Sequence, residues 1–363
     1  MKKTLKLAVA ASVLATPAMA SNIPGPYNTL NDNMENPLYM PGQNMFYSKL
    51  SNGLMLKVAD DSDAHKMKHH DGDIEWPIVR VQEDLGWGIT DRWAVHGSVQ
   101  YTHNADIDRT GLSAGRIGTT YRILNLYHGL VWDVYGDFHL GGLGKMRGQF
   151  NVTSMNPTTG VFDYDNYSNG KWGYHVGTKV GKVWDRLTTS AFVEVLRTIG
   201  NDNNEIRVMV DQDLKNQMLM GAMNGNPMAT QGAMGILALP NNVSVDLKST
   251  TEISAGANAF YQLSDRWSTG LSFRYNHHAD NGVKKITSDL GFAEANRKDF
   301  EAMLKDMNDG FDEYIVGLSI ANQVTDHAQV ALYAEYTFDK GHPNSQNSTD
   351  AKAEAGVRLN FMF

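Results

Sequence analysis

The sequence has 363 residues, with 32 Lys and Arg, 40 Asp and Glu, and a formal net charge of −8. This negative charge argues against nucleic acid as a partner. The complete absence of cysteine excludes a disulfide scaffold, thiol catalysis and thiolate metal sites.

The N-terminus has the three parts of a secretory signal peptide. Lys2 and Lys3 form a basic start, an apolar stretch runs over 7–15, and small residues end at Ala20. The apolar stretch is too short to span a bilayer as a helix, and a buried N-terminal helix explains fewer of these features. We expect cleavage after Ala20, with residues 21–43 as a periplasmic N-terminal segment and residues 44–363 as the folded domain.

From residue 44 onward, apolar and polar side chains alternate with a period of two. Trp93, Val95 and Val99 alternate with His96 and Ser98, for example. This is the pattern of strands with one apolar and one polar face, and several apolar faces carry an aromatic residue near each end. We predict twelve strands, at 44–58, 77–90, 92–103, 112–124, 129–140, 171–184, 187–199, 246–263, 266–276, 312–325, 328–338 and 351–363.

The connections between these segments alternate between short and long. The long ones are 59–76, 104–111, 141–170, 200–245, 277–311 and 339–350. Outer-membrane barrels combine short periplasmic turns with long outside loops and an even number of strands. Soluble β-sandwiches have no reason to sort loop lengths in this way. The sequence therefore predicts an all-β protein, an antiparallel transmembrane β-barrel of twelve strands with both termini periplasmic.

Two positions test this prediction. The last segment must pair with the first, because an open sheet edge in lipid would leave backbone groups unsatisfied. Its final residue, Phe363, resembles the assembly signal of bacterial outer-membrane proteins. That resemblance implies a Gram-negative source and recognition by the barrel-assembly machinery. Glu83 falls on the face assigned to lipid, which predicts a bulge or a shift of register in the second strand.

Two hairpins resemble a more particular family. The segments LGWGITDRWAVHGSVQY (85–101) and FYQLSDRWSTGLSFRY (260–275) each contain a strand, a turn of the form (T/S)-D-R-W and a second strand. Together with ENPLYMPGQNMFYS (35–48), they resemble the meta-pathway (phenol-degradation) type of outer-membrane transporter. Asp91 and Asp265 suit a tight turn, and Arg92 and Arg266 suit a position near lipid headgroups.

The polar face of the strands predicts the residues that line the lumen. Their charges nearly cancel, which favours a narrow and weakly selective channel. A polar filling that only stabilises the barrel is the alternative. The predicted lumen residues are Arg80, Asp84, Arg116, Arg122, Asp133, Asp137, His139, His175, Lys179, Glu194, Glu252, Arg274, Glu335, Lys352, Glu354 and Arg358.

The loop at 200–245 is unusually rich in methionine for a segment in water. Methionine gives an adaptable apolar surface, so one hypothesis is a lid or constriction that admits apolar solutes. The alternative is that the loop folds into the barrel mouth and forms a small core of its own. In the next long loop, 277–311, apolar residues at helical spacing predict a short amphipathic helix. The constriction would use Met218, Met220, Met223, Met228 and Met234.

Metal binding and catalysis have weaker support. Histidines cluster at His65, His69 and His70 and again at His277 and His278, a spacing that two-histidine metal sites use. The pattern is also typical of solvated loops, so we predict no metal and no other cofactor. No G-x-S-x-G motif occurs, and a membrane-embedded hydrolase is the least supported class.

The sequence thus predicts a channel or transporter in the outer membrane, and not an enzyme. Its expected partners are outer-membrane lipids, lipopolysaccharide, the barrel-assembly machinery and a small-molecule solute. The main alternative is a structural or surface-interaction barrel with a plugged lumen.

Overall fold

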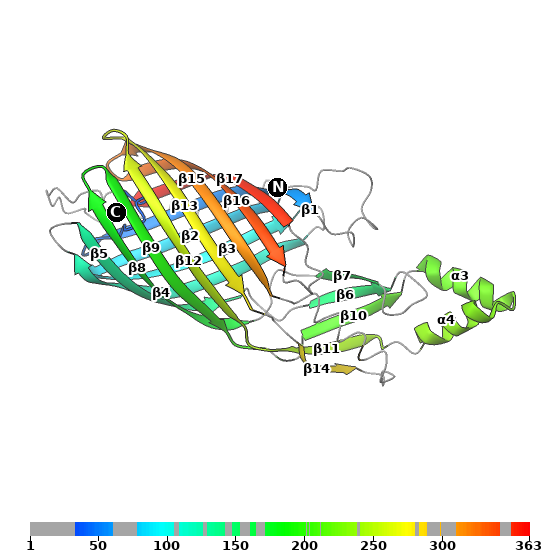
Figure 1. Ribbon diagram of the computed structural model, residues 1–363. Helices are drawn as coiled ribbons and strands as arrows, with labels where there is room; N and C mark the ends of the chain where they lie inside the picture. Colours follow the sequence, from blue (N-terminus) through cyan, green and yellow to red (C-terminus); the bar gives the residue numbers. More distant parts are fainter. Residues whose placement is uncertain are drawn as a thin grey trace.

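The computed structural model describes residues 33–60, 78–104, 109–125, 129–141, 147–152, 160–164, 171–200, 202, 204–210, 212–237, 240–279, 283–288, 298, 310–341 and 350–363. It contains a closed barrel and a separate five-stranded sheet (Figure 1). The barrel strands are β1 (Phe46–Asp60), β2 (Ile78–Thr90), β3 (Trp93–Asn104), β4 (Arg109–Asn125), β5 (Leu130–Leu140), β8 (Trp172–Trp184), β9 (Leu187–Thr198), β12 (Thr251–Gln262), β13 (Trp267–His278), β15 (Phe311–Thr325), β16 (Ala328–Gly341) and β17 (Asp350–Met362).

The barrel is the predicted ring of twelve antiparallel strands. Its last strand, β17, pairs with its first, β1, along most of its length. Two backbone hydrogen bonds between Phe46 and Phe363, of 2.9 and 2.8 Å, extend this pairing to the end of the chain. The expected closure is confirmed, and the barrel sheet has no free edge.

Short turns and long connections lie at opposite ends of the barrel, because every pair of successive strands is antiparallel. The turns at 91–92, 185–186 and 326–327 mark what we call the short-turn end. The opposite end, from which the long connections leave, is called the long-loop end.

The outer surface of the barrel is apolar. Trp87 and Trp93 are exposed near the short-turn end, and Tyr336 and Phe338 are exposed toward the long-loop end. The indole N–H of Trp93 donates a hydrogen bond of 2.6 Å to the hydroxyl group of Thr119. An apolar band with aromatic side chains near both ends is the outer surface of a barrel that lies in lipid.

Glu83 is an exception on this outer surface. The strand pairing runs without interruption through Glu83 on both sides, and the irregularity of β2 lies between Gly88 and Thr90. The predicted bulge or register shift at Glu83 is therefore wrong. Its carboxylate accepts a hydrogen bond of 3.3 Å from the hydroxyl group of Ser48 on β1, which also points outward. This contact replaces part of the hydration that a carboxylate loses in lipid.

The second sheet was not predicted. Three connections that the sequence analysis treated as loops together form an extension, in which the strand order is β14-β11-β10-β6-β7. Strands β6 and β10 are parallel, and the other pairs are antiparallel. The extension consists of β6 (Arg147–Val152), β7 (Gly160–Tyr164), β10 (Asn204–Val210), α3 (Gln212–Met223), α4 (Pro227–Leu237), β11 (Asn242–Leu247) and β14 (Val283–Ser288).

The extension has an apolar core of its own. Phe150, Ile206, Val243 and Val245 are fully or almost fully buried in it, and Met218 of α3 packs against them. Figure 1 shows the sheet projecting from the long-loop end, with α3 and α4 at its far tip. No helix among the described residues is long and apolar enough to span a membrane.

The predicted strand at 246–263 joined two elements that the structure separates. Asp246 and Leu247 end β11 in the extension, and β12 of the barrel begins at Thr251. The helix predicted within 277–311 lies almost entirely outside the described residues, and β14 occupies the start of that segment.

Candidate functional site: the lumen of the barrel

Among the described residues, two of the cavities lie on the polar face of the strands, inside the barrel. One, of about 520 Å³, lies against residues 34–41, and the other, of about 310 Å³, is lined by strand residues alone. The predicted lumen residues that line one or both of them are Arg80, Asp84, Arg116, Asp133, Asp137, His175, Lys179, Glu194, Arg274, Glu335, Glu354 and Arg358.

The remaining predicted lumen residues also face inward. Arg122 contacts the backbone of Leu38 inside the barrel. His139 and Lys352 lie two positions along their strands from residues that line a cavity, and Glu252 contacts His278. Alternation was thus a sufficient signal for the inward face, because side chains of one strand alternate strictly between its two faces.

The short-turn end is filled by residues 33–43, which we call the plug. The side-chain amide of Asn33 donates to Gln262 and Ser268, each at 3.3 Å, and accepts a hydrogen bond of 2.9 Å from Gln329. These partners lie on three different barrel strands. Residues 33–43 of the N-terminal segment expected at 21–43 thus lie against the barrel strands, while residues 21–32 lie outside the described part of the chain.

Leu38 is the apolar centre of the plug. Its side chain is completely buried against Val131 of β5 and Val183 of β8. The guanidinium group of Arg122 donates a hydrogen bond of 2.6 Å to the Leu38 carbonyl oxygen and two more, of 2.8 and 3.0 Å, to Asp133. The arginine thus links the plug to the wall, and its charge is compensated where water is excluded.

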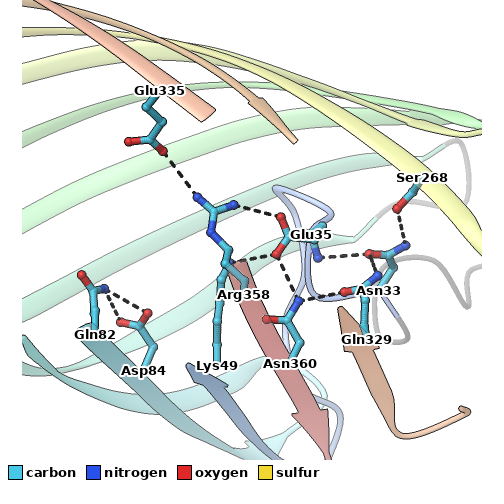
Figure 2. A network of polar contacts seen from close by, with 10 residues as sticks. All are labelled: Asn33, Glu35, Lys49, Gln82, Asp84, Ser268, Gln329, Glu335, Arg358 and Asn360. Carbon is cyan, nitrogen blue, oxygen red and sulfur yellow. Dashed lines mark hydrogen bonds and ion pairs between the residues drawn. The ribbon is translucent and has the colours of Figure 1, made fainter. Parts of the chain in front are cut away.

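Glu35 is the charged anchor of the plug. Its carboxylate accepts hydrogen bonds of 3.0 Å from Arg358 and 3.1 Å from Asn360, and it forms an ion pair of 3.4 Å with Lys49 (Figure 2). Burial by itself would raise the pKa of Glu35, but Lys49, Arg358 and Asn360 outweigh it and lower the pKa to about 2. The plug is therefore docked with a charged carboxylate at neutral pH.

Sequence reasoning missed Glu35, because it precedes the first strand and belongs to no periodic pattern. Lys49 was also missed, although its signal was available. It occupies a position of β1 with the same parity as Ser51, which lines the lumen.

One wall of the lumen carries a histidine bridged by carboxylates. The Nδ1 atom of His175 lies 2.7 Å from Asp137, and its Nε2 atom lies 3.3 Å from Glu194. Tyr135 donates a hydrogen bond of 2.7 Å to Glu194, and His96 contacts the other oxygen of Asp137. Both ring nitrogens of His175 are engaged by acids, so neither is available to activate a serine hydroxyl.

A second cluster lies near the long-loop end. His278 stacks on Phe311 and forms ion-pair contacts of 3.2 Å with Glu252 and 3.8 Å with Glu313. Glu313 was missed, although alternation within β15 places it on the same face as Gly317 and Ser319, which line a cavity. The adjacent His277 points outward and contacts Asp312 at 2.8 Å.

No group of three or more His, Cys, Asp or Glu residues among those described has an arrangement that could hold a metal ion. The histidines at 65, 69 and 70 lie outside the described residues.

The methionines proposed as a constriction lie away from both cavities. Met218 is buried in the core of the extension, where the loop does form a small core, but one outside the barrel mouth. The other four are exposed on α3 and α4, at the tip farthest from the barrel (Figure 1). They are Met220, Met223, Met228 and Met234.

Comparison with known proteins supports the fold. No protein-family model matches the sequence, and the search of the curated proteins found no match. Among solved structures, the COG4313 outer membrane channel from Pseudomonas putida F1 has a TM-score of 0.51 and 8% sequence identity, covering 91% of this chain and 98% of that chain. The NanC porin has a TM-score of 0.41 and 10% identity, with coverages of 85% and 98%.

At these identities the likeness concerns the fold. The chain has the fold of an outer-membrane β-barrel, as the closed ring of twelve strands already indicates. The resemblance of its hairpins to the meta-pathway transporters stays a prediction.

Proposed function

We propose that the protein is an outer-membrane channel for small polar molecules. The observation that supports this best is the pair of polar cavities inside a closed barrel with an apolar outer surface. Cavities of this kind provide hydrated space for solutes. The strands pair all their backbone groups with one another, and the apolar outer surface is compatible with the lipid. In this proposal the barrel-assembly machinery inserts the chain among outer-membrane lipids and lipopolysaccharide, with the short turns toward the periplasm.

The plug supplies the gate in this proposal. It is held by hydrogen bonds and ion pairs to several strands, and by one leucine side chain in a small apolar pocket. Polar contacts of this type exchange with water at modest net cost. Solute passage requires the plug to shift from the position that it occupies here.

A reversible covalent lock tests the gate. The side chains of Asn36 and Thr188 are joined by a hydrogen bond of 3.2 Å, and the chain has no cysteine of its own. In the variant with Asn36→Cys and Thr188→Cys, any intramolecular disulfide must therefore join the plug to β9, and free-thiol titration measures whether it has formed. In planar bilayers we expect the oxidised variant to conduct less than the reduced one, and each single-cysteine variant to show no redox effect. Equal conductance in both states would mean that solutes pass without plug movement.

A second candidate is a barrel that serves surface interactions. The exposed methionines of α3 and α4 favour it, since adaptable apolar surface is typical of binding sites. This candidate predicts no conductance and no solute flux, either from the intact protein or after deletion of residues 33–43. It also leaves the polar cavities without a role, so we place it second.

A further inference from the structure

The smaller cavity of the lumen, which we call the arginine cavity, is unusually rich in cationic groups. It has a volume of about 310 Å³ and is lined by Lys49 and the four arginines Arg80, Arg116, Arg274 and Arg358. Its acidic lining residues are fewer, namely Asp84, Glu335 and Glu354. Across the whole lumen the charges nearly balance, so the two signs are segregated within it.

In most of the ion pairs at this cavity the carboxylate is less exposed than its arginine. In the pair of Arg80 and Glu354, at 3.0 Å, 33% of the arginine side chain is exposed and 6% of the glutamate. For Arg274 and Glu194 the exposed fractions are 41% and 10%. A solute in the cavity therefore meets guanidinium groups more than carboxylates.

Two further pairs join an arginine and a carboxylate that both line the cavity, whereas Lys49 and Arg358 also pair with Glu35 of the plug. Arg116 is 43% exposed and its partner Asp84, at 3.8 Å, is 21% exposed. In the pair of Arg358 and Glu335 the carboxylate is the more exposed partner, since 19% of the arginine side chain and 32% of the glutamate side chain are exposed. In three of these four arginine pairs the cation is thus the more exposed partner.

The cationic groups face one another across the lumen. Strands β2 and β13 are separated by four strands in the barrel order β13-β15-β16-β17-β1-β2, so they occupy nearly opposite walls of the ring of twelve. Arg80 stands on β2 and Arg274 on β13. A ligand with an acidic group at each end would contact both.

Both arginines keep donors that their ion pairs do not use. Within the described part of the chain, the Nε atoms of Arg80 and Arg274 are buried and have no hydrogen-bond partner. Because these two Nε atoms are inaccessible, a ligand in the cavity would bind through the terminal nitrogens of the two guanidinium groups. Guanidinium groups bind carboxylates through paired N–H donors.

We propose that the arginine cavity is a binding site for a small organic dianion with two carboxylate groups, held between Arg80 and Arg274. The proposal rests on the proposed channel function and names its solute class. The cavity volume is at the lower end of the range for small-molecule sites, which suits a short dicarboxylate. Cationic rings are also the arrangement by which pores favour anions.

Succinate is the probe for this site. In planar bilayers containing the full-length protein, succinate should reduce the potassium chloride current at lower concentration than acetate, because acetate reaches one wall only. Glycine and choline should have little effect, since the first carries one charge of each sign and the second is a cation. Block by glycine or choline at the succinate concentration would overturn the proposal.

Arg274→Gln removes the charge of one wall. We expect the succinate concentration that halves the current to rise about tenfold or more, as expected for the loss of a charged hydrogen bond. Arg274→Lys should raise this concentration by an intermediate amount, because lysine keeps the positive charge but lacks the paired N–H donors of the guanidinium group. Lys215→Gln, on the exposed surface of α3, is the matched control and should change nothing. An unchanged succinate block in Arg274→Gln would overturn the proposal.

Calorimetric titration separates this proposal from the channel function. Succinate binding to detergent-solubilised wild-type protein, weakened in Arg274→Gln, supports the site even if the protein conducts no current. Conductance without measurable succinate binding would overturn the site and leave the channel function standing. Heat-modifiable migration in electrophoresis verifies that each variant is folded.

Discussion

The barrel and the extension are both built from strands in which apolar and polar residues alternate, but the interior of the barrel is polar and the interior of the extension is apolar. In β5 of the barrel, Asp133 is buried inside and Trp132 is exposed outside. In β10 of the extension, Ile206 is buried inside and Arg207 is exposed outside. The barrel excludes lipid and holds polar groups, whereas the extension excludes water and holds apolar ones. The difference teaches that alternation defines two faces but does not say which of them is the interior.

The largest effect should come from a charge placed in the apolar core of the extension. Ile206→Asp would bury an uncompensated carboxylate and should cost more than about 3 kcal/mol. We expect the extension to become sensitive to protease while the barrel keeps its heat-modifiable migration. Arg207→Asp, one position along on the exposed face, should retain protease resistance. Loss of the barrel in Ile206→Asp would show that the two regions fold as one unit.

The reverse change belongs in the barrel, where removing a charge should be harmful. Arg122→Ala leaves Asp133 buried without its partner and frees the plug carbonyl at Leu38, at a cost of about 3–5 kcal/mol. Urea unfolding in lipid vesicles measures the change. Arg92→Ala, at an exposed turn, is the control and should stay within about 0.5 kcal/mol of wild type. Equal midpoints for Arg122→Ala and wild type would contradict the role of polar groups inside the barrel.

Acid should loosen the plug and leave the extension intact. The pKa of Glu35 is lowered from 4.5 to about 2, so its contribution to docking is full above pH 4.5 and disappears as the pH falls toward 2. The contribution is about 3 kcal/mol by proton linkage. We expect conductance to rise across this window while the protease resistance of the extension is unchanged.

Glu35→Gln provides the control for that experiment. It removes the titrating group, so most of the rise in conductance on acidification should vanish. If the variant responds to acid as wild type does, other lumen groups control the gate.

The smallest effect concerns the outer surfaces. Glu83→Leu should stabilise the barrel in lipid by about 1 kcal/mol, because a carboxylate on the lipid face is unfavourable. Glu205→Leu changes an exposed glutamate of the extension and should give no such gain. Unfolding in vesicles distinguishes the two variants, and destabilisation by Glu83→Leu would show that the contact with Ser48 has a structural role.

Much of the fold was predictable, and the failures have physical reasons. The strand predicted at 187–199 is observed as Leu187–Thr198, because a long alternating segment between tight turns allows few other assignments. The strands of the extension were missed because they are short. Only residues 204–210, 242–247 and three similar segments form its sheet, and each needs partners from another connection to bury its apolar face.

The plug was missed for a related reason. Residues 33–43 have no periodicity, and their contacts are with residues as distant in sequence as Gln329 and Asn360. No local pattern can indicate such contacts, because they exist only after the ring has closed.

The sequence by itself determined the strands of the barrel, the apolar and polar face of each strand and the sorting of turns and loops, since these depend on side chains two positions apart and on chain length between them. The tertiary structure decided which face of each sheet is the interior, where residues 33–43 lie and how the lumen charges are segregated. Those properties depend on which distant strands become neighbours, and closure of the ring from β1 to β17 is what brings them together.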